Sequence, residues 1–490
     1  FGRYGVSPGT VTLQNLATTT FGGLGFNADG SLFAVADQSG AVNYRGNAGP
    51  TTGYSLVNAT VGGLPGVYFN GAPQEYISIP LTRYSAFGAA NYDVSDTLTF
   101  YGQASFSRLE SKTQLGPIPA GGSTAAPVVP VTNPFIPTDL ATLLASRPDP
   151  TADFEIAKRL FDFPRTERNR IDTFQVTLGA KGKLGVRGWT WEVYGSYGKS
   201  DQTTTGTGYS SRRALDTLLR APDGGVSLCA GGYNPFGINP LSEACRAYVN
   251  RTGGYTLTND LGVVEGTIQG GLFELPYGEV RFAAGADYRD MSFERVASSI
   301  YNVEPAPAPN GAGLPDALVP AVVTSAKGSY NAKEIFGELL VPILKDIPGF
   351  RRLDLGLGYR YSDYSSIGGV HSYKVEGDWE PFDGLRFRAG YQRANRAPSL
   401  DVLFASTQQL VSLGSGANRD PCNAAATGAT SAAGNAQIRS LCAAQGVPAA
   451  GASTPQFVQT VGVGNPDLKE ETADTFTVGG VVQPKFASPV

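Results

Sequence analysis

The chain has 490 residues with 38 basic and 42 acidic side chains, a formal net charge of −4 and 41% hydrophobic residues. This charge leaves no basic surface of the kind that binds nucleic acid, so we expect no nucleic-acid partner. No stretch approaches the ~20 consecutive apolar residues of a membrane helix, and a helical membrane protein is therefore excluded.

The first part of the chain alternates between hairpins and long polar excursions. Residues 1–75 read as a loop leading into the rest, because glycine, asparagine, threonine and alanine dominate there without sustained alternation. Three predicted hairpins cover about 76–108, 170–202 and 260–295. The excursions that follow them cover about 109–168, 203–259 and 296–328.

The second part of the chain carries the clearest strands. Residues 333–341 are ambiguous between helix and strand, but their place opposite the strand 352–362 across a short turn favours a strand. Further strands follow over about 371–379 and 385–392, joined by a tight turn over 380–384. A last excursion over about 405–467 leads to a strand that begins near Glu470.

Each clear strand has one apolar and one polar face, because side chains alternate along a strand. Leu353, Leu357 and Tyr361 share one face, while Asp354 and Arg360 share the other. The apolar faces end in aromatic residues, as expected where a lipid-facing band meets water. Short turns at one end and long loops at the other complete the pattern. It predicts an all-β fold, a transmembrane antiparallel β-barrel with four extracellular loops, and a soluble surface adhesin is the less favoured alternative.

About eleven strands are recognisable, whereas bacterial barrels close with an even number. We therefore expect residues 76–490 to form part of a larger barrel whose other strands lie outside this sequence. Five charged residues on the polar faces are candidates for the lumen: Arg360, Lys374, Glu376, Arg386 and Arg388. They would line a polar path or contact a domain inside the barrel, or only neutralise one another.

The four cysteines form two local pairs, with Cys229 and Cys245 16 residues apart and Cys422 and Cys442 20 apart. A zinc site is disfavoured, because C-x-x-C spacing is missing and the single histidine, His371, is distant in sequence. Two loop disulfides in an oxidising compartment are the favoured interpretation, with four free thiols as the alternative.

Ligand contacts and catalysis leave weaker signals. Five loop aromatics are candidates for stacking on a ligand, or else pack the loops themselves: Tyr209, Tyr233, Phe236, Tyr248 and Phe457. His371 and the scattered carboxylates form no catalytic or cofactor-binding pattern. We therefore expect neither an enzyme nor a cofactor.

Two motifs in the last quarter carry a family resemblance. The first places Arg396 and Pro398 at a strand end, followed by Leu403 and Phe404. The second has the form N-P-x-L-x-x-E, with Asn465, Pro466, Leu468 and Glu471, although Thr477 stands where a glutamate is common. In this order, on consecutive strands, the pair resembles the TonB-dependent receptors.

The resemblance implies a 22-stranded outer-membrane barrel of a Gram-negative bacterium, plugged by an N-terminal domain. Such receptors take up scarce nutrients, such as siderophore-bound iron, cobalamin or oligosaccharides. The implied partners are outer-membrane lipid, a small extracellular ligand, and a TonB-type energising protein that binds through a TonB box. Neither the plug nor the TonB box is recognisable in these residues, and a passive, porin-like barrel is the alternative function.

Overall fold

The fold comes from a computed structural model that describes most of the chain. Side chains are described for residues 75–116, 128–136, 141, 144–145, 150–151, 153, 165–236, 241–302, 315–318, 322–405, 421–422, 434–447 and 462–483. For further short strands only the backbone is described: β1 (Tyr4–Val6), β2 (Thr10–Thr12), β3 (Leu24–Phe26), β4 (Leu32–Phe33), β5 (Tyr54–Val61), β6 (Leu64–Asn70), β9 (Pro119–Ala120), β11 (Phe154–Arg159), β21 (Gln408–Leu413) and, but for its last residue, β22 (Phe457–Gly462).

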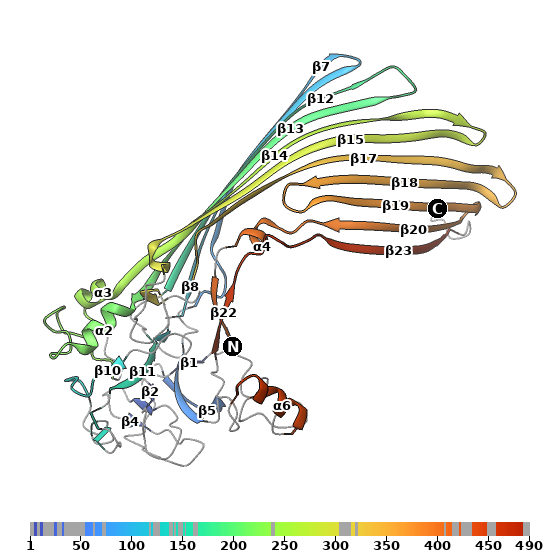
Figure 1. The fold of residues 1–490 in the computed structure, drawn as a ribbon. Helices are drawn as coiled ribbons and strands as arrows, with labels where there is room; N and C mark the ends of the chain where they lie inside the picture. The colour runs from blue at the N-terminus through green and yellow to red at the C-terminus, as the bar shows by residue number, and fades with distance from the viewer. Residues whose placement is uncertain are drawn as a thin grey trace.

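One large antiparallel sheet dominates the described residues (Figure 1). The strands of its main path are β7 (Leu81–Ser95), β8 (Leu98–Leu115), β12 (Arg165–Lys183), β13 (Thr190–Ser211), β14 (Asn250–Leu275), β15 (Gly278–Ala297), β17 (Ala326–Ile347), β18 (Phe350–Tyr364), β19 (Gly368–Phe382), β20 (Leu385–Arg396) and β23 (Glu471–Val482). They lie in chain order across the sheet, from β7 at one edge to β23 at the other. The eleven strands confirm the predicted antiparallel all-β architecture, and the sheet is open rather than closed.

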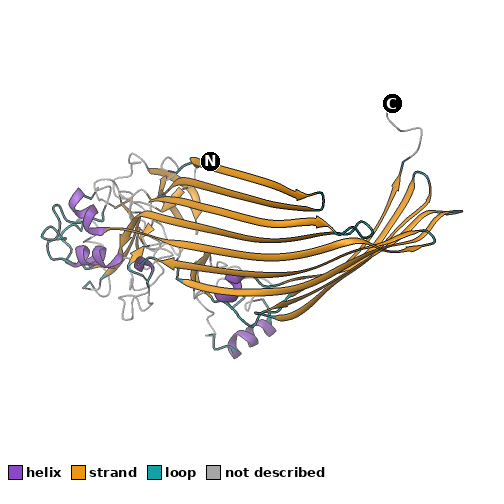
Figure 2. Ribbon diagram, turned by 90° about the horizontal axis from the view of Figure 1, so that it is seen from above, coloured by secondary structure: helices purple, strands orange, loops and turns teal. Residues whose placement is uncertain are grey.

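The two ends of the sheet differ, as Figures 1 and 2 show. At the turn end, tight turns join strands, as at Pro276 and Tyr277 between β14 and β15. Gly384 precedes β20 with a φ of 86°, a left-handed conformation that glycine adopts without strain. At the loop end lie the helices, including those between β13 and β14.

The sheet has an apolar face whose large side chains are exposed. All eleven strands contribute to this apolar band: Tyr92, Phe100, Leu178, Val193, Val264, Tyr288, Ile335, Tyr359, Val375, Phe387 and Val478. Toward the loop end the same face becomes polar, where Arg108 Nε lies 2.6 Å from Asp172 Oδ1 and Arg393 Nη2 lies 2.8 Å from Asp474 Oδ2. A band of this kind matches the lipid-facing surface of a membrane barrel.

A compact cap lies at the loop end. It consists of the helices α2 (Arg212–Arg220) and α3 (Glu243–Val249) with the segments 128–136, 221–236 and 315–318. These segments include β10 (Val128–Val129) and β16 (Ala317–Leu318), and β16 pairs with β13. The side chain of Ser211 caps α2 by accepting a hydrogen bond from Ala214 N. Leu215, Leu218 and Leu219 have helical spacing and are fully buried, so the cap has a core of its own.

The remaining helices among the described residues are short. They are the 3₁₀ helix η2 (Ser299–Tyr301), α4 (Leu400–Phe404) and α6 (Ala436–Ala444). Within the part of the chain that is described, none of the helices has the length and apolar character needed to cross a membrane.

Some boundaries differ from those expected from sequence. Residues 1–75, read as a loop, contain the short strands β1 to β6. The excursions are shorter than expected, since β13 continues to Ser211 and β14 already begins at Asn250. Both strands turn polar near the loop end, where apolar alternation stops although backbone pairing continues. Residues 333–341 lie within β17, as the favoured interpretation predicted.

Candidate functional site

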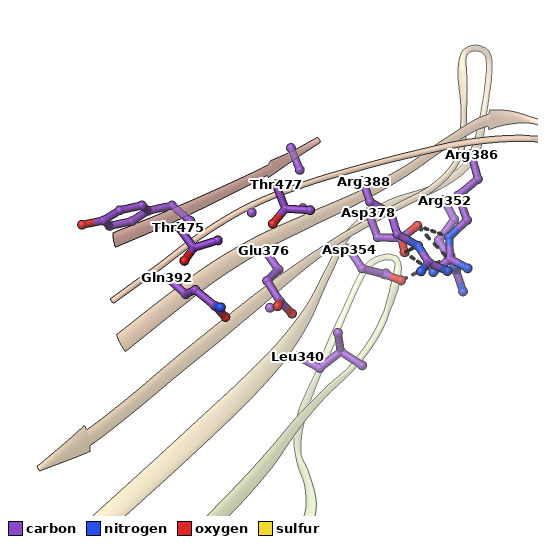
Figure 3. A pocket seen from close by; sticks show the side chains of 15 residues that line it. Leu340, Arg352, Asp354, Glu376, Asp378, Arg386, Arg388, Gln392, Thr475 and Thr477 are labelled. Atoms are coloured by element: carbon purple, nitrogen blue, oxygen red, sulfur yellow. Dashed lines mark hydrogen bonds and ion pairs between the residues drawn. The ribbon is translucent and has the colours of Figure 1, made fainter. Parts of the chain in front are cut away.

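The polar face of the sheet holds the predicted lumenal charges. Strand register sets Asp354 of β18 opposite Asp378 of β19, which is in turn opposite Arg388 of β20. With Arg352, Glu376 and Arg386 they line a pocket of about 540 Å³ (Figure 3). Three successive strands therefore place charged side chains on the same face of the sheet, and these side chains line the pocket.

Asp378 is the centre of an ion-pair network, which we call the Asp378 network. Arg386 makes two hydrogen bonds to the carboxylate, and its Nε lies 2.6 Å from Oδ1. Arg352 Nη2 lies 3.4 Å from Oδ1, and Arg388 Nε lies 3.5 Å from Oδ2. Arg352 also pairs with Asp354 at 3.3 Å. Three arginines thus share two aspartates beside Glu376, so the formal charges in the pocket cancel.

A second network crosses β15, β17 and β18, and we call it the Glu334 network. The side chains of Glu334 and Asp287 are only 1% and 3% exposed and lie opposite each other in the ladder. Arg289 and Arg360 both donate to Glu334, and Tyr364 Oη donates at 3.2 Å. Asp287 Oδ1 lies 3.2 Å from Arg289 Nε. Two buried carboxylates are thereby held by two arginines.

Arg360 also contacts an aromatic ring. Its guanidinium carbon lies 4.5 Å from the centre of the Phe336 ring, within the range of a cation–π interaction. Lys374 pairs instead with Glu338, its Nζ 3.2 Å from Oε1, and lines a second pocket together with Arg360. The structure therefore gathers Glu376, Arg386 and Arg388 in one pocket and separates them from Arg360 and Lys374.

Sequence reasoning missed Asp287, Arg289 and Glu334. A signal for the first two was present, because they occupy the opposite phase to the apolar residues Phe282 to Tyr288 of the third hairpin. Glu334 was hidden by the helix-or-strand ambiguity of its segment. Lateral pairing across three strands is a property of the register, which the sequence does not display directly.

The two family motifs meet at the loop end, in what we call the motif junction. Arg396 ends β20 and lies opposite Glu471 of β23, with Nη1 and Oε2 3.4 Å apart. Gly464 N donates to Ala405 O at 2.7 Å, and Asn465 N donates to Val402 O at 2.9 Å. The two family motifs are therefore joined by backbone hydrogen bonds.

Each remaining motif residue has a structural place at this junction. Pro398 lies in the link between β20 and α4, and Pro466 lies in a turn that precedes the exposed Leu468. Asn465 Oδ1 accepts a hydrogen bond from Asp467 N at 3.0 Å. Leu403 is 2% exposed.

Phe404 packs against β17 at a glycine. A Cβ added to Gly328 would lie about 2.2 Å from the Phe404 ring, so only glycine accommodates the ring there. Through this contact the motif junction fixes the base of the last excursion to β17.

The predicted loop aromatics are mostly cap residues. Tyr209, Tyr233 and Phe236 are buried in the cap core, which favours a packing role, while Tyr248 is partly exposed at the end of α3. The Phe457 side chain lies outside the described residues. No group of three potential metal ligands occurs among the residues whose placement is described.

Both predicted disulfides are present, Cys229–Cys245 in the cap and Cys422–Cys442 with Cys442 in α6, and the prediction is confirmed. The turn before Cys229 is ordered by Asp223, whose carboxylate accepts from Ser227 N at 2.7 Å and Gly225 N at 3.0 Å. Hydrogen bonding to Ser227, followed by the Gly225 bond, lowers the pKa of Asp223 below its usual value. The cap is therefore cross-linked covalently and anchored by an ionised carboxylate.

Comparisons with known proteins show similarity to one protein family and to several solved structures. The family model described as TonB dependent receptor-like, beta-barrel, matches residues 126–488. A search of curated proteins gave no significant match.

Among solved structures, the chain is similar to the siderophore receptor PirA of Acinetobacter baumannii, with 14% identity, a TM-score of 0.41, and coverage of 83% of this chain and 41% of that one. It is also similar to a variant of the ferric enterobactin receptor PfeA of Pseudomonas aeruginosa in complex with enterobactin, with 15% identity, a TM-score of 0.44, and coverage of 83% and 41%. The chain therefore spans about two-fifths of the length of these receptors.

Proposed function

The chain belongs to the family of TonB-dependent receptor β-barrels, and from that premise we propose that it serves TonB-energised import of a scarce nutrient. As a member, it is an outer-membrane protein of a Gram-negative bacterium, and the family consists of receptors rather than enzymes. The ligand classes to distinguish are ferric siderophores, cobalamin and oligosaccharides.

One observation carries the proposal beyond the family match. A sheet with an exposed apolar band on one face and charged networks on the other suits a barrel wall between lipid and a polar lumen. Charge at membrane depth is costly unless it faces a lumen or a protein interior and is paired. The paired networks at Asp378 and Glu334 meet that condition.

The rest of the receptor is also part of the proposal. In hydrocarbon, each unpaired backbone group at the edges β7 and β23 would cost several kcal/mol. We infer that both edges pair with further strands, and that a plug domain fills the lumen and contacts the TonB-type protein. The intact mass of the natural protein tests this inference. A mass well above 51.3 kDa is expected, and a mature chain of that mass would contradict it.

Transport assays in the native host test the function. A deletion strain and a strain complemented with the full-length receptor are compared for uptake of radiolabelled ferric enterobactin, cyanocobalamin and a maltodextrin. We expect receptor-dependent uptake of one probe, which is lost when the TonB-type protein is deleted. Receptor-dependent uptake that persists without that protein would instead indicate a passive barrel, and no receptor-dependent uptake of any probe would count against import of these three classes.

A further inference from the structure

The polar face divides into two unlike surfaces. On β8, β12 and β13, the polar-face positions within 103–111, 169–177 and 196–204 form what we call the neutral wall. None of these fifteen positions, all of them described, holds a charged residue, and all but Leu109, Ile171 and Gly198 hold a hydroxyl or amide side chain. On β15 and β17 to β20, by contrast, the Glu334 and Asp378 networks fill the same face, which we call the charged wall.

The neutral wall is held together by weak bonds between uncharged groups. The hydroxyls of Thr173 and Ser200 lie 3.2 Å apart, and those of Thr177 and Ser196 lie 3.0 Å apart. Gln175 Nε2 donates to the Ser196 hydroxyl at 3.2 Å. A hydroxyl both donates and accepts by rotating its proton, so each of these bonds can be exchanged for a bond to water or to a solute.

The charged wall cannot exchange its partners so easily. Glu334 is held by two arginines and a tyrosine, and removing either arginine leaves a buried charge uncompensated. Such a surface is fixed, because a charged group could bind a passing solute only after one of these ion pairs had been broken. Passage along a lumen needs binding that is favourable enough to enter and weak enough to leave. The neutral wall satisfies that requirement and the charged wall does not.

From this division we propose that the imported ligand passes along the neutral wall, on β8, β12 and β13, and presents uncharged amide and hydroxyl groups to it. The inference rests on the proposed import function and deepens it. In this arrangement the ion pairs keep the charged wall fixed, while water and ligand pass along the neutral wall.

Two serines provide a matched test. Ser200 of the neutral wall and Ser372 of the charged wall are both half-buried, and each makes a side-chain hydrogen bond, Ser372 to Asn395 Nδ2 at 3.0 Å. Both lie at the loop-side border of the apolar band, beside Lys199 and His371 respectively. Ser372 is opposite Arg360 in the ladder, so the two serines differ mainly in the wall that surrounds them.

The first experiment measures access. Ser200→Cys and Ser372→Cys are made separately in the full-length receptor in intact cells, with the unsubstituted receptor as background. The four cysteines of these 490 residues form disulfides, and the unsubstituted receptor measures the labelling of any other thiol. A membrane-impermeant, uncharged polyethylene-glycol maleimide is expected to label Ser200→Cys several-fold faster than Ser372→Cys. Equal rates, or faster labelling of Ser372→Cys, would overturn the proposal.

The second experiment asks whether the wall carries ligand. Ser200→Cys is modified with a methanethiosulfonate that adds a trimethylammonium group, or with an uncharged one of similar size. The cationic adduct is expected to lower TonB-dependent uptake about tenfold, equivalent to about 1.4 kcal/mol, and the uncharged adduct much less. Uptake unaffected by the cationic adduct would contradict the proposal.

The same ferric enterobactin, cyanocobalamin and maltodextrin probes serve here. Import of none of them by the unmodified receptor would count against the proposed function, whereas the labelling rates would still decide whether the neutral wall is the accessible side.

Discussion

The main sheet and the cap follow opposite rules of burial. In the sheet, Leu178 is 65% exposed while Glu334 is almost completely buried. In the cap, Leu218 is fully buried and Asp223 lies at the surface. The difference shows that the two regions of the chain are adapted to different surroundings. The sheet is arranged for lipid outside and paired charge inside, and the cap is arranged for water, with an apolar core that a disulfide reinforces.

The largest effect is expected from removing a buried partner in the sheet. Arg289→Leu leaves Glu334 and Asp287 with Arg360 alone, which should destabilise the barrel by up to about 3–5 kcal/mol. Urea unfolding of the detergent-solubilised full-length receptor measures the change. Adding Glu334→Gln should restore part of the loss, and a double variant no more stable than Arg289→Leu alone would show that the network does not act as a unit.

The next effect tests the apolar face directly. Leu178→Arg puts a charge in the lipid-facing band and should cost about 2–4 kcal/mol, depending on its depth. Gln175→Arg, on the polar face of the same strand, is the control and should cost much less. Folding yield into lipid vesicles and urea unfolding report both values. Equal costs for the two variants would mean that the faces are assigned wrongly.

The cap should respond separately from the sheet. Replacing Cys229 and Cys245 together by serine removes a cross-link over 16 residues, which is worth roughly 3 kcal/mol in the chain-entropy model. We expect faster proteolysis within 212–249 and unchanged urea unfolding of the barrel. A shift of the barrel transition by the same amount would show that cap and sheet unfold as one unit.

The smallest effect belongs to the motif junction. The side chains of Arg396 and Glu471 are both about three-quarters exposed, so Arg396→Gln should change stability by no more than about 1 kcal/mol. Gly328→Ala should act more strongly at the same place, because a methyl group would collide with the Phe404 ring. Limited proteolysis of the last excursion distinguishes the two variants, and equal sensitivity would argue against the Phe404 contact as the anchor.

Sequence alone revealed the sheet well because period-two alternation is strong wherever one face meets lipid. The hairpin turn at Leu275 to Gly278 and both disulfides were predicted correctly. Predictions were weaker near the loop end, where the apolar face of the sheet becomes polar. The strand ends near Ser211 and Asn250 were missed for that reason.

The candidate site was only partly visible in the sequence. Arg360, Arg386 and Arg388 were found from their phase, but their partners depend on register across several strands. Tyr209, Tyr233 and Phe236 looked like possible ligand contacts because aromatic residues in a polar excursion give no sign of whether they pack with one another. Burial within a cap assembled from distant segments is a tertiary property, which local pattern does not encode.

The chain-order arrangement of the strands has a consequence for how the molecule assembles. Each strand from β12 to β20 pairs with the main-path strands that come before and after it along the chain. Long chain loops therefore have to close only where an excursion separates two such strands. Local pairing of this kind speeds folding, because little chain entropy is lost before a contact forms. A hairpin can dock on the edge left by the previous one, and each addition renews that edge. Such a sheet can grow by repeated addition, with the hairpin as the kinetic unit of assembly.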